Sequence, residues 1–197
     1  MMLNKNNLDE ILHALDRQIE VYGGSPISLV VCGGTALFVL GLIIRTTKDI
    51  DVLGTVSEKH GQILVKKINK FPKYLTDASK DVQKDFGLPE GWINKGPTSQ
   101  VDSGLPQGFE KRLIKKQYGN YLSIYYISRL DQIYFKLFAA VDRNDYHVDD
   151  LFQLKPTKQE IEDAARWVLT QDVSLGFKAI LKDFLRKHGY EEISEGI

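Results

Sequence analysis

The sequence predicts a mixed α/β (α+β) fold, in which a small mixed β-sheet is packed with helices and is followed by a C-terminal helical lobe. Short β-favouring apolar runs alternate with helical patterns as far as residue 128, whereas residues 129–197 carry helical patterns alone. A chain of 197 residues, 43% hydrophobic and 26% charged, has the composition of an ordinary globular protein. We therefore expect an α/β core over residues 1–128 and a helical lobe over residues 129–197, packed as one compact unit.

The first part of the core is predicted to alternate helices and strands. A helix is expected from residue 8, because apolar residues recur at helical spacing until the glycines and proline of "YGGSP". The apolar run "ISLVVC" at residues 27–32 is typical of a buried strand, and it ends at two glycines. Residues 35–44 are good helix formers, and "DIDVLG" at residues 49–54 predicts a second strand. The apolar residues within 57–70 favour a further helix.

Residues 71–197 differ in how clearly their sequence predicts secondary structure. Residues 71–110 contain repeated breakers and no clean periodicity, so no element is assigned there. The runs "KRLIKKQY" and "YLSIYYIS", joined by "GN", predict a β-hairpin. Three amphipathic helices follow, and Thr157 with Glu160 has the spacing of a capping box at the start of the second.

The bulk composition limits the class of protein. Lys and Arg (26) balance Asp and Glu (26), so no global basic field favours nucleic acid or an anionic membrane. The single cysteine, Cys32, allows no disulfide within the chain, which favours a reducing compartment. No segment reads as a signal peptide or reaches the ~20 apolar residues of a membrane span. We expect a cytoplasmic protein with no membrane partner.

Two carboxylates mark the start of the second predicted strand. Asp49 and Asp51 are two residues apart, so on an extended strand their side chains leave the same face. Two such carboxylates repel each other unless a cation or a shared proton relieves them. Mg²⁺ (or Mn²⁺) accepts one or two carboxylates and leaves positions for substrate phosphates. The pair therefore predicts a divalent metal site, although a solvated strand edge would give the same pattern.

Two glycines mark the preceding turn between strand and helix. Gly33 and Gly34 would let backbone N–H groups approach a phosphate closely, and a helix starting near Thr35 would add the positive end of its dipole. Alone, a Gly-Gly pair is more often just a tight turn. In the order strand, Gly-Gly-Thr, helix, Asp-Ile-Asp, the pattern favours a metal-bound nucleoside triphosphate.

The same residues carry a resemblance to a known family. The stretch "VVCGGTALFVLGLIIRTTKDIDV" resembles the signature of the nucleotidyltransferase superfamily, which has the polymerase-β-like fold. The later stretch "LDQIYFKLFAAVDRNDYHVDDLFQL" resembles the second half of bacterial toxin nucleotidyltransferases of the abortive-infection type and their uncharacterised relatives. The resemblance implies a nucleotidyltransferase core over residues 1–128.

The resemblance also implies roles for individual residues. It gives phosphate contacts to Gly33, Gly34 and Thr35, and metal binding to Asp49 and Asp51. It adds Lys136 as a phosphate or nucleotide contact and Asp149 or Asp150 as a further polar or basic element of the site. The structural alternatives are a lysine at the edge of an apolar helix face for Lys136 and a helix N-terminal charge for Asp149 and Asp150. Arg45 and Lys48 flank the acidic strand and could neutralise phosphates or pair with the carboxylates.

One feature of the superfamily is missing from the expected place. Many members carry a third acid on a later strand, yet "YLSIYYIS" has none. Asp102 and Glu110 are the candidates for this role, and each lies in the segment without an assigned element. The gap puts full two-metal chemistry in doubt.

The function predicted is the Mg²⁺-dependent transfer of a nucleoside monophosphate from a nucleoside triphosphate to an acceptor hydroxyl. The acceptor is left open among tRNA, a protein and a small molecule; the cluster "EKRLIKKQY" could contact a phosphate backbone or be a solvated strand face. The alternative is a catalytically inactive module that binds nucleotide or a protein partner, such as one half of a toxin–antitoxin pair. A plain α/β domain with a coincidental motif is the third possibility.

Overall fold

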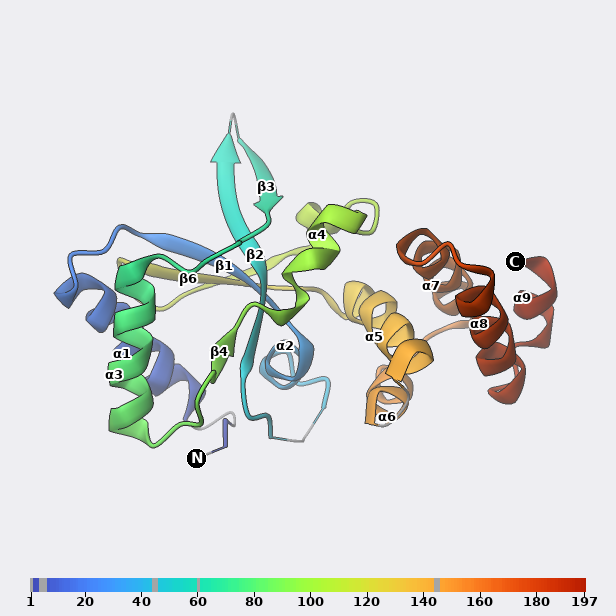
Figure 1. Cartoon of the computed structure of the whole chain (residues 1–197), viewed down its shortest axis with the longest axis horizontal. Helices are drawn as coiled ribbons and strands as arrows, with labels where there is room; N and C mark the ends of the chain where they lie inside the picture. Colours follow the sequence, from blue (N-terminus) through green and yellow to red (C-terminus); the bar gives the residue numbers. More distant parts are fainter. Residues whose placement is uncertain (1, 4–6, 44–45, 60, 144–145) are drawn as a thin grey trace. The chain divides into compact units, whose positions relative to one another are not determined.

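The computed structural model describes residues 2–3, 7–43, 46–59, 61–143 and 146–197. Contacts divide the chain into two compact units: residues 1–102 with 108–128, and residues 103–107 with 129–197. The first unit contains the sheet and the second contains the C-terminal helices (Figure 1). The mixed α/β fold class predicted from the sequence is confirmed. The boundary predicted at residue 128 stays a prediction.

Among the described residues, six strands form one mixed sheet in the first unit. Its order is β3-β2-β1-β6-β5, and the short strand β4 pairs with β2. β1 lies parallel to β6 and antiparallel to β2, which makes β1 the centre of the sheet. The bounds are β1 Ile27–Cys32, β2 Ile50–Lys59, β3 Gln62–Lys66, β4 Ile93–Asn94, β5 Ile114–Gln117 and β6 Leu122–Tyr126.

Helices of the first unit cover the sheet and connect its strands. α1 (Leu8–Val21) and α3 (Lys73–Phe86) pack side by side (Figure 1). α2 (Gly33–Val39) connects β1 to the segment that leads into β2. Short helical turns follow β4: η1 (Gly96–Ser99), α4 (Gln100–Ser103) and η2 (Phe109–Arg112). The centre of the core consists of fully buried apolar side chains. β1 contributes Leu29, Val30 and Val31, and α1 contributes Ile11, Leu15 and Ile19.

Most elements predicted from local pattern are confirmed. The first helix, the strand at 27–32, the strand beginning "DIDV" and the β5–β6 hairpin are all present. The helix predicted over residues 35–44 begins earlier and is shorter. α2 starts at Gly33, within the predicted turn, and ends at Val39, where Gly41 with a positive φ of 70° closes it.

The helix predicted over residues 57–70 is wrong. β2 continues to Lys59 and turns back through β3, with Ser57 opposite Leu64. Side chains along β3 alternate between exposed and half-buried, as on a strand with one covered face. On this strand Ile63 and Val65 point to one face and Leu64 points to the other. The apolar run therefore does not form one face of a helix.

The second unit is helical in its described residues. Its main helices are α5 (Arg129–Arg143), α6 (Tyr146–Gln153), α7 (Lys158–Gln171), α8 (Leu175–Lys187) and α9 (Glu191–Gly196). The predicted capping box is confirmed: the Thr157 side chain accepts the Glu160 N–H, and the Glu160 carboxylate accepts the Thr157 N–H.

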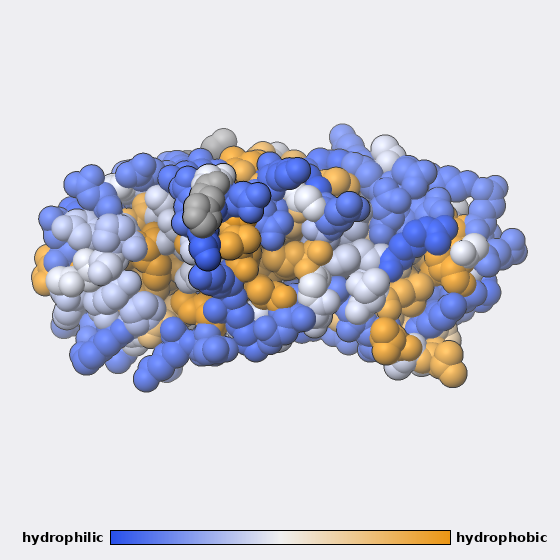
Figure 2. All heavy atoms as spheres, turned by 90° about the horizontal axis from the view of Figure 1, so that it is seen from above, coloured by the Kyte–Doolittle hydropathy of each residue, from blue (hydrophilic) through white to orange (hydrophobic). Residues whose placement is uncertain are grey.

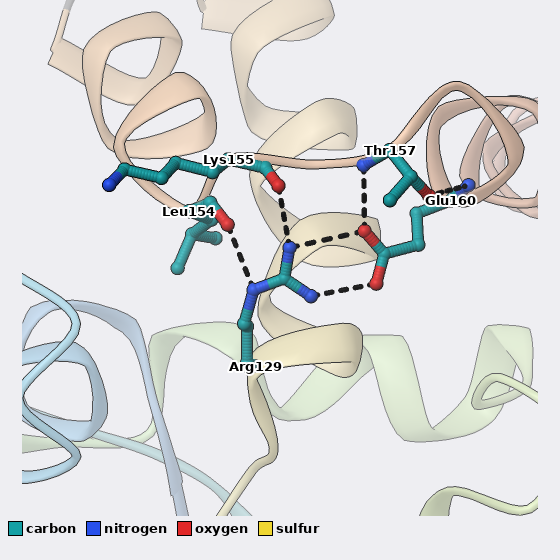
Figure 3. A network of polar contacts seen from close by, with 5 residues as sticks. All are labelled: Arg129, Leu154, Lys155, Thr157 and Glu160. Carbon is teal, nitrogen blue, oxygen red and sulfur yellow. Dashed lines mark hydrogen bonds and ion pairs between the residues drawn. The ribbon is translucent and has the colours of Figure 1, made fainter.

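One arginine connects the start of α5 to the turn before α7 (Figure 3). Arg129 pairs with both oxygens of Glu160, at 2.7 and 3.1 Å. The same guanidinium donates to the carbonyl oxygens of Leu154 and Lys155, each at 2.8 Å. Lys155 has a positive φ of 49°, and the hydrogen bond to its carbonyl helps to hold this turn. Arg129 thus joins three segments of the unit.

The surface of the described residues is partly apolar. The face shown in Figure 2 is mostly hydrophilic, and apolar residues reach it in separate patches. Among the described helices, none combines the length and the apolarity that a bilayer span requires.

Candidate functional site

The two carboxylates of the Asp-Ile-Asp motif lie where β2 begins. Ile50 between them is buried, whereas Asp49 and Asp51 are both partly exposed. Asp51 lies opposite Cys32, the last residue of β1, and Asp49 is held from α2 because the Thr35 hydroxyl donates to the Asp49 carbonyl at 2.7 Å. The end of β1, the start of α2 and the start of β2 therefore meet at one point.

A bulge in β2 lies just beyond this point. Val30 pairs with Gly54 and Val31 pairs with Val52, so Leu53 is the extra residue on β2. Bulges bend a strand and re-aim the side chains beside them, and they are frequent next to active sites. Here the bulge follows Asp51 by two residues and sets the register in which Asp51 faces Cys32.

Gly33 faces the carboxylate of Asp51 directly. A Cβ atom placed on Gly33 would lie 2.4 Å from Asp51 Oδ2, and the φ of Gly33 is 68°. Both facts require glycine here, since an L-residue would be strained at this φ and would collide with the carboxylate. The first glycine of the predicted motif therefore makes room for an acid. Gly34 and Thr35 are buried behind it.

Asn94 is the third side chain at the two carboxylates. Its amide nitrogen donates to Asp49 Oδ2 at 3.3 Å and to Asp51 Oδ1 at 3.2 Å. Its amide oxygen accepts the backbone N–H of Gly96 at 2.8 Å, which fixes the end that faces the acids. One oxygen of each carboxylate thus converges on a single donor group.

Long-range contacts place Asn94. β4 pairs in parallel with the start of β2, which puts Asn94 beside Asp51, and the Ile50 N–H donates to the Trp92 carbonyl at 2.6 Å. Trp92 is buried and its indole N–H donates to the Ser79 carbonyl of α3 at 2.9 Å. Asn94 was not predicted from the sequence, because it lies in the segment to which no element was assigned; the short apolar pair "WI" before it was the one local signal.

A third carboxylate does not join the pair in the described part of the chain. Within it there is no group of three or more His, Cys, Asp or Glu side chains able to hold a metal ion. Asp102 in α4 pairs with Lys67, and Glu110 lies in η2. Among the described residues, neither Asp102 nor Glu110 completes a three-carboxylate metal site with Asp49 and Asp51. A polar group that contacts both carboxylates is the amide of Asn94.

Lys136 and Asp150 form a buried ion pair in the helical unit. The Lys136 ammonium lies 2.7 Å from Asp150 Oδ2, and the two side chains are only 6% and 1% exposed. The Lys136 nitrogen also lies 5.6 Å from the centre of the Tyr146 ring. Asp149 is exposed. The structure therefore brings two predicted site residues together with each other, and their role toward a nucleotide stays a prediction.

Lys48 and Arg45 are the two remaining cations predicted at the site, and the structure describes one of them. Lys48 is exposed and directly precedes Asp49. Arg45 lies outside the described residues. Lys48 is therefore the one flanking cation whose position beside the acidic strand is described.

The donor set at Asp49 and Asp51 fits a divalent cation of the Mg²⁺ class. Such ions take hard oxygen ligands, use one or two protein carboxylates and keep positions for water or phosphate. Both carboxylates are partly exposed, and an oxygen of each already faces one hydrogen-bond donor. A positively charged group is therefore the natural complement of this pair of side chains.

Comparison with known proteins agrees with the motif. The family model described as "Nucleotidyltransferase of unknown function (DUF6036)" matches residues 8–154. The match covers most of the chain and includes Gly33, Asp49, Asp51, Asn94 and the Lys136–Asp150 pair. No curated protein and no solved structure matches the chain.

Proposed function

The chain belongs to this family of nucleotidyltransferases of unknown function, and from that premise we propose that it transfers a nucleoside monophosphate from a nucleoside triphosphate to an acceptor hydroxyl. The observation that carries the proposal is the convergence of Asp49 and Asp51 on one point beside Gly33. Asp49 and Asp51 would hold Mg²⁺ or Mn²⁺, which supplies positive charge to the reacting phosphates when bound. The family membership confirms the superfamily suggested by the motif.

The protein's own residues would orient the substrate. Gly33 makes room for the Asp51 carboxylate at the start of α2, and Gly34 follows it. Without side chains at these two positions, their backbone N–H groups would be able to approach the triphosphate. Thr35 holds the Asp49 backbone through its hydroxyl, which gives it a positioning role in addition to any phosphate contact through its N–H. Lys48, and Arg45 as predicted from the sequence, would add positive charge beside the phosphates.

In the reaction, the acceptor oxygen forms a bond to the α-phosphorus while the bond from that phosphorus to pyrophosphate breaks. The acceptor hydroxyl gives its proton to solvent water, and pyrophosphate leaves in line. Catalysis of this kind depends on positioning and charge more than on a covalent intermediate. The meeting of β1, α2, β2 and β4 around Asp49 and Asp51 supplies such positioning.

A second candidate function is nucleotide or partner binding without catalysis, as in one half of a toxin–antitoxin pair. The observation that favours it is the amide of Asn94 beside two carboxylates that no third acid joins among the described residues. The two candidate functions use the same nucleotide site. They differ in whether a nucleoside monophosphate is transferred from the nucleotide to an acceptor.

The experiment compares wild-type protein with the Asp49→Asn, Asp51→Asn double variant, and uses Asp9→Asn as a control. Asp9 makes an exposed ion pair with Lys116 on β5 and has no part in the proposed site. Calorimetry with each of ATP, GTP, CTP and UTP, with and without Mg²⁺, should show metal-dependent binding that the double variant loses and Asp9→Asn keeps.

Transfer is then followed with α-³²P-labelled nucleotide and three acceptor pools: tRNA, protein and small polyhydroxy compounds. Label on an acceptor that disappears in the double variant supports the transferase. Metal-dependent binding without transfer to any pool supports the binding module. Equal nucleotide binding by wild type and the double variant would overturn the assignment of the site.

A further inference from the structure

Asn94 holds an unusual position for an amide, because its NH₂ group donates to two carboxylates at once. The distances to Asp49 Oδ2 and Asp51 Oδ1 are nearly equal, 3.3 and 3.2 Å. The Gly96 N–H, at 2.8 Å from the Asn94 oxygen, requires the oxygen to point away from the acids. The turn after β4 therefore fixes the donor end of the amide toward the pair.

This arrangement matters because Asp49 and Asp51 carry like charges in close proximity. Hydrogen bonds to ionised groups are stronger than hydrogen bonds between neutral groups. The NH₂ group of Asn94 has a partial positive charge and faces one oxygen of each carboxylate, so it reduces their mutual repulsion. It can do part of what a cation does, without a full charge.

We propose that Asn94 is an internal counter-group that sets the cation affinity of the site, holding Asp49 and Asp51 in place when no cation is bound and lowering their affinity for one. The proposal rests on the proposed function, since it assumes that the two acids bind a divalent cation. A group that stabilises the cation-free form more than the cation-bound form weakens binding by the same free energy. Coordination withdraws charge from the carboxylates, so the Asn94 hydrogen bonds are strongest before a cation arrives.

A purely structural role for Asn94 gives a different result. If the amide only tied β4 to β2, removing it would lower the stability of the cation-free and cation-bound forms equally. Cation affinity would then be unchanged. If instead Asn94 positioned the acids for coordination, removing it would weaken cation binding. The direction of the change in affinity separates the three roles.

The test measures Mn²⁺ binding without nucleotide, by the electron paramagnetic resonance signal of free Mn²⁺, together with the thermal midpoint of each form. Asn94→Ala should bind Mn²⁺ about tenfold more tightly than wild type and should melt at a lower temperature without the ion. Asn94→Asp keeps an oxygen for the Gly96 N–H and replaces the donor with a third carboxylate. It should bind Mn²⁺ more tightly still and show the largest rise in midpoint on Mn²⁺ addition.

Controls and outcomes keep this inference separate from the proposed function. Asp9→Asn should leave the dissociation constant for Mn²⁺ unchanged. An affinity in Asn94→Ala that is unchanged or weaker overturns the inference, whatever the transfer assay shows. Tighter binding by both Asn94 variants supports it even if no acceptor receives nucleotide, in which case the transferase proposal falls alone. If wild type binds no Mn²⁺, Asn94→Asp must create binding that Asp49→Asn removes; failure to do so also overturns the inference.

Discussion

The carboxylate of Asp16 occupies the space that a side chain at residue 119 would need. A Cβ atom on Gly119 would lie 1.9 Å from Asp16 Oδ2. Asp16 is buried in α1, and its other oxygen accepts the backbone N–H groups of Tyr121 and Leu122, both at 2.7 Å. One acid of the first helix therefore holds the turn between β5 and β6 and the start of β6.

This contact predicts that Gly119→Ala is strongly destabilising. The methyl group must displace a carboxylate that accepts two short hydrogen bonds, so the free energy of unfolding should fall by about 3 kcal/mol. Urea denaturation followed by the fluorescence of Trp92, in a Trp167→Phe background, reports on the unit that contains the turn. The matched control is Gly176→Ala in α8.

Gly176 has open space where an alanine methyl group would lie, since beyond the adjacent helix backbone no atom of the described residues comes within 4 Å, and it has no positive φ. Alanine should stabilise α8 by about 0.5–1 kcal/mol, because glycine loses more backbone entropy in a helix. The two Gly→Ala changes should thus have opposite signs in denaturation followed by circular dichroism. A Gly119→Ala variant as stable as wild type would show that Asp16 can move without loss.

The Arg129–Glu160 pair predicts a loss of stability at acid pH. The hydrogen bonds from Arg129 hold the pKa of Glu160 below its ordinary range, and the Thr157 N–H acts in the same direction. Because the folded-state pKa is depressed, the stabilisation is present above the unfolded-state pKa and is lost as the pH falls through the folded-state value. Stability of the helical unit should therefore decrease from about pH 5 downward.

Glu160→Gln should remove this part of the pH dependence. The variant should be less stable than wild type at pH 7 by roughly 1–2 kcal/mol, and the difference should shrink toward pH 3. Arg129→Lys should also destabilise, since a lysine cannot donate to Glu160, Leu154 and Lys155 in the planar geometry of Figure 3. Parallel pH profiles for wild type and Glu160→Gln would contradict the linkage.

The buried Lys136–Asp150 pair predicts strong coupling between two substitutions. Asp150→Leu alone leaves the ammonium of Lys136 buried without its partner 2.7 Å away, and should cost about 3–5 kcal/mol. Lys136→Met with Asp150→Leu should recover at least half of that loss, because buried ion pairs are often replaceable by apolar residues. Urea denaturation of both single variants and the double variant gives the coupling energy.

The same variants test whether Lys136 acts on nucleotide. If the double variant is stable and still binds nucleotide with Mg²⁺ as wild type does, the pair is structural. If it is stable but binds nucleotide at least tenfold more weakly, the prediction that Lys136 contacts the nucleotide is supported. Stability measured beside binding keeps unfolding from being mistaken for loss of a contact.

Local patterns predicted that Gly33, Asp49 and Asp51, which are close together in the sequence, would lie near one another. The structure places Gly33 against Asp51, and Asn94 bridges Asp49 and Asp51, while their role in a functional site stays a prediction. Asn94 was not predicted because a pairing of β4 with β2 joins residues more than forty positions apart. The position of Asn94 beside the two acids depends on Trp92, whose indole N–H donates to the Ser79 carbonyl of α3. No local sequence pattern predicts this contact.

The error at residues 57–70 has a related cause. Ile63, Leu64, Val65 and Ile68 satisfy a helical spacing in part, and a short apolar run does not distinguish a helix from a strand. Pairing of β3 with β2 decides between them, aided by the turn at Gly61, whose φ is 75°. Tertiary contacts therefore override a local preference that is weak in either direction.

The contact between Gly33 and Asp51 gives the sharpest test of the site. Gly33→Ala places a methyl 2.4 Å from Asp51 Oδ2 at a φ of 68°, so it should displace the carboxylate and weaken Mn²⁺ binding at least tenfold. Gly41→Ala is the matched control: its φ is 70°, yet apart from its chain neighbours no atom of the described residues lies within 4 Å of the added methyl. Both variants carry the same backbone strain, about 1 kcal/mol, and only Gly33→Ala collides with an acid.

The difference in Mn²⁺ affinity between Gly33→Ala and Gly41→Ala isolates the effect of the collision, since strain alone would affect both variants equally. Equal affinity in the two variants would mean that Asp51 does not bind the cation in the position described, and Asp49 would then have to hold it without its neighbour.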